Sequence, residues 1–198
     1  MLKKYSNQVG EDFYAHETAI IDNPEMIGKD TKIWHFSHVL GNTNIGEGCT
    51  IGQNVMIGPD VTMGKNCKVQ NNVSIYKGVF LEDDVFCGPS CVFTNVLNPR
   101  ASIEKKDEFR QTLVKKGSTI GANATIICGV ELGEHSFIGA GSVVTKDIPS
   151  FGLVIGNPGK LVGWVGKFGE KLDEKLICPT TGEKYEEVSP GILKEKGD

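Results

Sequence analysis

The sequence has no surplus of positive charge and no long apolar run. Among its 198 residues, 21 Lys and Arg stand against 25 Asp and Glu, which gives a formal net charge of −4. Nucleic-acid-binding domains usually carry a basic surplus, so we expect no nucleic-acid partner. No stretch approaches the ~18 apolar residues of a membrane-spanning helix. The first eight residues, Met-Leu-Lys-Lys-Tyr-Ser-Asn-Gln, lack the apolar segment of a secretory signal. We therefore expect a cytoplasmic protein with no membrane partner.

The motifs of several metal sites and hydrolases are also missing. Without a secretory signal, the six cysteines are expected to be reduced thiols and not disulfides. No two of them have C-x-x-C spacing, which argues against a zinc knuckle. A zinc site of the carbonic-anhydrase kind needs three convergent imidazoles. His35 and His38 belong to one short unit but point to different sides of it, so we expect no metal. Neither G-x-S-x-G nor G-x-x-x-x-G-K-[ST] occurs, which argues against a Ser-His-Asp hydrolase and a P-loop.

What the sequence does have is glycine, at 25 of 198 positions, and a period of six. A large apolar residue recurs at every sixth position, with Cys87 as the one exception. The next residue is often Gly, and the fourth residue after the apolar one is small or β-branched. The series consists of Ile21, Ile27, Ile33, Val39, Ile45, Ile51, Ile57, Met63, Val69, Ile75, Leu81, Cys87 and Phe93, then Val114, Ile120, Ile126, Leu132, Ile138 and Val144.

A six-residue unit is too short for a helical repeat and suits a short strand followed by a corner. Three units then make one triangular coil of 18 residues, and coils stack about 4.8 Å apart through parallel hydrogen bonds. A β-sandwich, the alternative, does not predict so strict a period. We predict an all-β parallel β-helix over residues 16–155, after an N-terminal arm at 1–15 that could also be a lead-in coil. A loop at 94–113 interrupts it, and residues 156–198 form a short amphipathic helix (160–176) and a tail with a turn and a short strand.

Because the interior of such a coil is packed, a functional site must lie on an outer face or corner. Residues 18 apart stack, so one corner column contains Phe36, Asn54, Asn72 and Ser90. This column predicts a polar groove, or alternatively a ladder of amides that only hydrogen-bond to one another. The loop at 94–113 is either functional or a solvated charged segment.

The repeat over residues 16–148 resembles the hexapeptide-repeat acyltransferases. That family implies a left-handed coil, whereas the general rule for parallel crossovers favours a right-handed one. Other segments resemble the N-acetyltransferases that act on the 3-amino group of nucleotide-linked sugars. These segments are 34–38, 51–55, 68–76, 86–90, 93–96, 98–100 and 156–158. One branch uses UDP-2-acetamido-3-amino-2,3-dideoxy-glucuronate and another uses dTDP-3-amino-3,6-dideoxyhexoses. The tail pattern Cys178-Pro179-x-Thr181-Gly182-x-x-Tyr185 favours the uronate branch.

The resemblance implies an acetyl-CoA-dependent enzyme without a metal, in surface-polysaccharide (O-antigen) precursor synthesis. It implies a homotrimer with active sites between subunits. Positioning would supply most of the acceleration, with Asn72 orienting the sugar amine and a backbone amide stabilising the oxyanion. Either no strong general base is needed, or His38 accepts the proton. The other residues expected to bind the substrate are His35, Gln70, Asn71, Tyr76, Asn95 and Arg100. Those expected to bind coenzyme A are Gly139, Ala140, Gly141, Asn157, Pro158 and Lys160. Two alternatives stay open: an acyltransferase acting on a hydroxyl group, and a non-catalytic β-helix scaffold.

Overall fold

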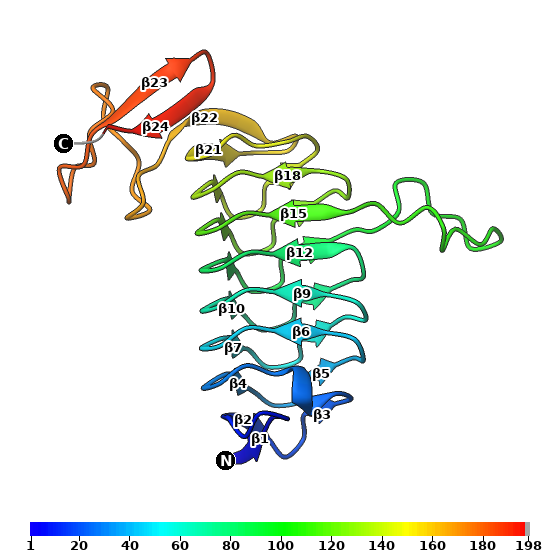
Figure 1. Cartoon of the computed structure of the whole chain (residues 1–198). Helices are drawn as coiled ribbons and strands as arrows, with labels where there is room; N and C mark the ends of the chain where they lie inside the picture. The colour runs from blue at the N-terminus through cyan, green and yellow to red at the C-terminus, as the bar shows by residue number, and fades with distance from the viewer. Residues whose placement is uncertain (197–198) are drawn as a thin grey trace.

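Most coils of the chain have one short strand on each of three sides. The structure is a computed structural model that describes residues 1–196. Coils stack from β1 near the N-terminus to β21 and β22 at the other end (Figure 1). Within the described part the only helix is a single 3₁₀ turn, η1 (Pro24–Met26). The predicted all-β fold is therefore confirmed.

Three sheets form the sides of this prism, here called faces A, B and C. Face A consists of β1 (Leu2–Ser6), β2 (Asp12–His16), β4 (Lys32–Ile33), β7 (Thr50–Ile51), β10 (Lys68–Val69), β13 (Phe86–Cys87), β16 (Thr119–Ile120), β19 (Phe137–Ile138), β21 (Gly152–Ile155) and β22 (Lys160–Trp164). Face B consists of β3 (Ile20–Ile21), β5 (His38–Val39), β8 (Met56–Ile57), β11 (Ser74–Ile75), β14 (Val92–Phe93), β17 (Thr125–Ile126) and β20 (Val143–Val144). Face C consists of β6 (Asn44–Ile45), β9 (Thr62–Met63), β12 (Val79–Leu81), β15 (Thr112–Val114) and β18 (Glu131–Leu132).

The six-residue series supplies the core. Stacked strands pair in parallel at a register of 18 residues, as in Ile33, Ile51 and Val69, and all three of these side chains are fully buried. The small residue of each unit also points inward, and all six cysteines are buried and free. The corners have left-handed backbone, at which Asn, Asp and Gly are the residues of least strain. The repeat in the sequence therefore encodes both the inward side chains and the turns.

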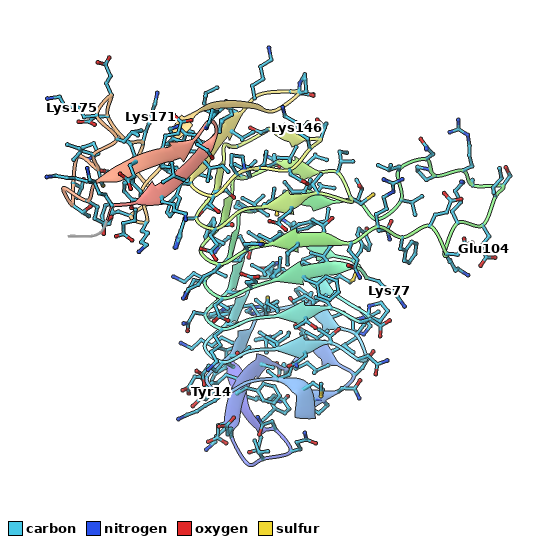
Figure 2. The ribbon with its side chains drawn as sticks, turned by 45° about the horizontal axis from the view of Figure 1, so that its top comes forward. Tyr14, Lys77, Glu104, Lys146, Lys171 and Lys175 are labelled. Carbon is cyan, nitrogen blue, oxygen red and sulfur yellow. The ribbon has the colours of Figure 1, made fainter. Side chains whose placement is uncertain are left out.

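The loop leaves face B after β14 and returns to face C at β15. It projects sideways from the edge between these faces (Figure 1). Its base is held because the Arg110 N–H donates to the Asn95 carbonyl at 3.0 Å. In Figure 2, Lys77 lies near the root of the loop and Glu104 near its outer end. Residues 112 and 113, placed in the predicted loop, already belong to β15.

The N-terminal segment joins the coil earlier than its sequence suggests. β1 is antiparallel to β2, and β2 pairs in parallel with β4. Residues 12–16 thus form the first parallel strand of face A.

The predicted helix over 160–176 is wrong. Residues 160–164 form β22, which runs antiparallel to β21, and the following residues are turns. Gly163 and Gly169 have φ of +156° and +90°, and glycine is also a poor helix former. Of the apolar residues in this segment, Trp164 and Leu172 pack into a second small core, whereas Leu161 and Phe168 are exposed. This second core consists of Phe151, Leu172, Cys178, Tyr185 and Leu193, with Trp164 and Leu176 packed against it.

The tail contains one more strand than predicted. A hairpin of β23 (Tyr185–Ser189) and β24 (Ile192–Glu195) closes the second core. Residues 197 and 198 of the predicted tail lie outside the described residues.

Candidate active site

The predicted corner column exists and is longer than predicted. From β4 to β20, each coil turns between faces A and B at one residue with positive φ. We call this line the A–B edge. From the N-terminal end upward it consists of Phe36, Asn54, Asn72, Ser90, Asn123 and Gly141, with φ of 57°, 56°, 61°, 57°, 56° and 69°. The edge therefore joins the predicted catalytic residue Asn72 to the predicted coenzyme A region.

Part of this edge is an amide ladder. Asn54 Nδ2 donates to Asn72 Oδ1 at 3.0 Å, and the Gln53 backbone N–H donates to Asn71 Oδ1 at 2.8 Å. The ladder alternative thus applies to Asn54. Asn72 Nδ2 keeps its two N–H groups without a partner in residues 1–196, so this amide can still donate to a ligand.

A hollow of about 280 Å³ lies on the face B side of the edge. We call it hollow B. It brings together the two residues predicted to be catalytic, Asn72 and His38. Its lining consists of Phe36, His38, Asn54, Val55, Met56, Asn72 and Ser74.

A second hollow of about 290 Å³, hollow A, lies on the face A side of the same edge. It brings together three residues predicted to bind the substrate, His35, Gln70 and Asn71. Its lining consists of Trp34, His35, Thr50, Gly52, Gln53, Val69, Gln70 and Asn71. The rings of Trp34 and His35 are nearly parallel, with an interplanar angle of 11°. The site can therefore offer both ring surfaces and amides to a ligand.

His16 packs against His35, a lining residue of hollow A, and was not among the predicted site residues. Its buried ring stacks on His35 with centroids 3.6 Å apart, and its Nδ1 lies 2.9 Å from Thr18 Oγ1. The Thr18 N–H also donates to this Nδ1, at 3.3 Å, which requires an unprotonated nitrogen. Burial, and then the neighbouring His35, lower the pKa of His16.

Asp22 is the second residue that the sequence analysis missed. His38 Nε2 lies 3.1 Å from Asp22 Oδ1, and the other carboxylate oxygen accepts the Gly41 N–H at 3.1 Å. One signal was available in the sequence. Asp22 directly follows the apolar residue of its unit, at a position where many other units have Gly, and this position faces outward.

Three predicted substrate residues lie elsewhere. Tyr76 follows β11 at the edge between faces B and C, and Asn95 lies at the root of the loop on that same edge. Arg100 is exposed on the loop, with its Nη1 donating to the Pro99 carbonyl at 3.3 Å. None of the three is among the residues that line hollow A or hollow B, although Tyr76 follows Ser74, a lining residue of hollow B, by two positions.

The predicted coenzyme A residues do come together, at the C-terminal end of the A–B edge. Gly139, Ala140 and Gly141 lie beside the turn that contains Asn157 and Pro158. The Gly156 N–H donates to Ser142 Oγ at 3.1 Å, and the Val143 N–H donates to the Gly156 carbonyl at 3.0 Å. Lys160 begins β22 and is exposed. A Cβ on Gly141 would have no atom within 4 Å, so the backbone here is open to a ligand.

Within residues 1–196, no three His, Cys, Asp or Glu side chains gather as a potential metal site. None of the helices described there has the length and apolar character needed to cross a membrane.

Comparison with known proteins supports the repeat. A family profile described as bacterial transferase hexapeptide (six repeats) matches residues 26–59, 42–77 and 112–146. A dTDP-3-amino-3,6-dideoxy-alpha-D-galactopyranose 3-N-acetyltransferase from Aneurinibacillus thermoaerophilus is 41% identical over 188 residues, 93% of this chain and 96% of that protein. A serine acetyltransferase from Buchnera aphidicola is 34% identical over 99 residues, 50% of this chain and 36% of that protein.

Solved structures share the architecture. A galactoside acetyltransferase in complex with coenzyme A has a TM-score of 0.56 at 25% identity, covering 67% of this chain and 68% of its own. A GDP-perosamine N-acetyltransferase from Caulobacter crescentus has a TM-score of 0.50 at 20% identity, covering 76% of this chain and 56% of its own. The second likeness concerns the fold alone. Together with the near full-length relative, these findings show that the chain is an acyltransferase with a left-handed β-helix and belongs to the hexapeptide-repeat acetyltransferase family.

Proposed function

We propose that this enzyme transfers the acetyl group of acetyl-CoA to the 3-amino group of a nucleotide-linked amino sugar. The main support is the near full-length relative, which is named as a 3-N-acetyltransferase of a dTDP-linked amino sugar. The tail pattern from Cys178 to Tyr185 favours a UDP-linked uronate. The relative instead favours the alternative substrate, a dTDP-3-amino-3,6-dideoxyhexose.

The observation that carries this proposal is the arrangement along the A–B edge. Asn72 and His38 line hollow B, and the candidate coenzyme A residues stand at Gly141 on the same edge. Asn72, Ser90, Asn123 and Gly141 are separated by three coil steps, which is about 14 Å at about 4.8 Å per step. An extended pantetheine arm lying along the edge brings the thioester from the Gly141 corner toward hollow B.

The chemistry needs little beyond positioning. The neutral amine nitrogen attacks the thioester carbonyl, the C–N bond forms, and the carbonyl oxygen takes up negative charge. The C–S bond then breaks, coenzyme A leaves as the thiolate, and the nitrogen loses a proton. Asn72 orients the reacting groups through its free N–H donors. His38 accepts the proton, since a neutral imidazole is a suitable base near neutral pH.

A homotrimer would complete the site. The outward residues of the face B strands include no fixed charge, and two of them, Ile20 and Val92, are 59% and 46% exposed. The full row consists of Ile20, His38, Met56, Ser74, Val92, Thr125 and Val143. Packing this face against a second copy would bury apolar surface. The cytoplasmic location remains a prediction from the absence of a secretory signal, and the role in surface-polysaccharide synthesis remains a prediction of the resemblance.

Mass spectrometry of products tests the proposal. The purified protein is incubated with acetyl-CoA and a panel of dTDP- and UDP-linked 3-amino sugars, 4-amino sugars and serine. We expect N-acetylation of a 3-amino sugar, with the dTDP-linked hexose turned over fastest. Acetylation of a hydroxyl acceptor alone would favour a different acyltransferase. Failure to bind coenzyme A would point to a scaffold.

A further inference from the structure

Asp22 and His38 form a hydrogen-bonded pair, and this bond indicates which imidazole nitrogen of His38 carries the hydrogen. His38 belongs to β5 and lines hollow B, and Asp22 directly follows β3 in the coil below. The Nε2–Oδ1 distance is 3.1 Å. A carboxylate has only acceptors, so the hydrogen between these atoms belongs to His38 Nε2.

Asp22 is itself held in place. Its second oxygen accepts the Gly41 N–H at 3.1 Å, and its own N–H donates to the Val39 carbonyl at 3.0 Å. Both side chains are partly exposed, at 41% for His38 and 44% for Asp22, so an exposed ion pair alone would contribute little stability. The two-point fixation nevertheless gives the carboxylate one orientation relative to the imidazole.

The strands on either side bring no competing charge. β3 presents Ile20 beside His38, and β8 presents Met56. Asp22 is therefore the titratable group that faces this imidazole from the adjacent coils. Nδ1 of His38 has no hydrogen-bond partner in the described part of the chain.

We propose that Asp22 is a positioning residue that keeps neutral His38 in the Nε2–H tautomer, so that Nδ1 is the atom that accepts the proton from the substrate amine. The catalytic part of this inference rests on the proposed function. The tautomer part stands on the hydrogen bonds alone. A neutral imidazole has one donor and one acceptor, so a donor directed at Asp22 leaves Nδ1 as the only basic nitrogen.

For the variant Asp22→Asn we predict the opposite tautomer of His38. The Gly41 N–H can only donate, so the amide oxygen of the variant must face Gly41. Its NH₂ group then points at His38 Nε2 and donates to it, which moves the imidazole hydrogen to Nδ1. The substitution thus removes the basic nitrogen from Nδ1 while it preserves the shape of the side chain.

Long-range ¹H–¹⁵N NMR of the imidazole nitrogens at pH 8 tests the tautomer, with His38 assigned from its loss in His38→Gln. We expect the Nε2–H form in the wild type and the Nδ1–H form in Asp22→Asn. The matched control is Asp84→Asn, which removes a carboxylate on a different edge at a position with φ of 60°, where Asn is also tolerated. The control should leave the His38 signals unchanged. A wild type in the Nδ1–H form, or an Asp22→Asn protein with the wild-type tautomer, would overturn the proposal.

Steady-state kinetics test the consequence with the best nucleotide amino sugar. We expect Asp22→Asn to lower kcat roughly 3- to 30-fold, with KM for acetyl-CoA unchanged and an altered pH–rate profile. Asp84→Asn should retain the wild-type kcat. A changed tautomer with unchanged kcat at every pH would refute the positioning role. Absence of turnover in the wild type would refute the proposed function instead, and the NMR result would still stand.

Discussion

Replacing Asn72 with Ala should lower both the free energy of unfolding and the turnover, each for its own physical reason. The stability term comes from the backbone, since Asn72 has φ of 61° and Ala in the left-handed region costs about 1–2 kcal/mol more than a residue that tolerates it. The exposed hydrogen bond from Asn54 adds about 0.5–1 kcal/mol. The free energy of unfolding should therefore fall by about 1.5–3 kcal/mol. Urea denaturation measures this part.

The turnover term comes from the N–H groups that Asn72 offers to hollow B. Loss of one orienting hydrogen bond costs roughly 1–3 kcal/mol in the transition state, which is a fall of about 5- to 150-fold in kcat/KM. We expect the loss to be at least as large as that caused by His38→Ala. A free sugar amine is already a good nucleophile near pH 8, so orientation matters more than proton removal.

The matched control is Asn66→Ala. Asn66 has φ of 55° and its Nδ2 donates to Asp84 Oδ1 at 3.3 Å, but it lies on the edge between faces C and A. It should lose the same stability and keep its turnover. Near-normal rates in Asn72→Ala together with a large loss in His38→Ala would refute the reasoning. Equal kinetic losses in Asn72→Ala and Asn66→Ala would show that backbone strain alone explains the effect.

Three further outcomes are expected. Replacing residues 98–109 with a Gly-Ser linker keeps the Arg110–Asn95 backbone bond, so the protein should fold but lose activity; full turnover in this variant would show that the loop is dispensable. Val92→Lys places a charge in the middle of face B and should convert a sedimenting trimer into an inactive but folded monomer, whereas a fully active wild-type monomer would contradict the trimer. Burial lowers the pKa of His16, so the unfolded chain binds this proton more tightly than the folded chain does. Above about pH 6.5, the pKa of a histidine in an unfolded chain, His16 should not affect the free energy of unfolding. Below this pH, the free energy of unfolding should fall as the pH drops. Urea midpoints at pH 7.5 and 5.0 should show a smaller difference in His16→Gln, and an unchanged difference would contradict this assignment.

The amino-acid sequence by itself determined the coil. Every sixth side chain must be apolar to fill the interior, and residues such as Asn54 and Asn72 recur at corners because they tolerate left-handed backbone. These constraints are local and repeat at a constant interval, so the fold and the A–B edge follow from counting along the chain. The extension of this edge past the loop to Asn123 and Gly141 came from the structure, because the loop breaks the 18-residue register between β13 and β16.

The tertiary structure alone decided which outward side chains pair. Asp22 meets His38, and His16 meets His35, because stacking brings neighbouring coils into register, and no motif along the chain marks these contacts. The tertiary structure also placed Arg100 on a loop that leaves from the edge between faces B and C, and Arg100 does not line hollow A or hollow B. At the C-terminus the apolar spacing favoured a helix, but pairing with β21 provided hydrogen bonds for β22 that outweighed this local preference. Outward pairing and strand addition depend on residues far apart in the sequence, which is why the repeat could not predict them.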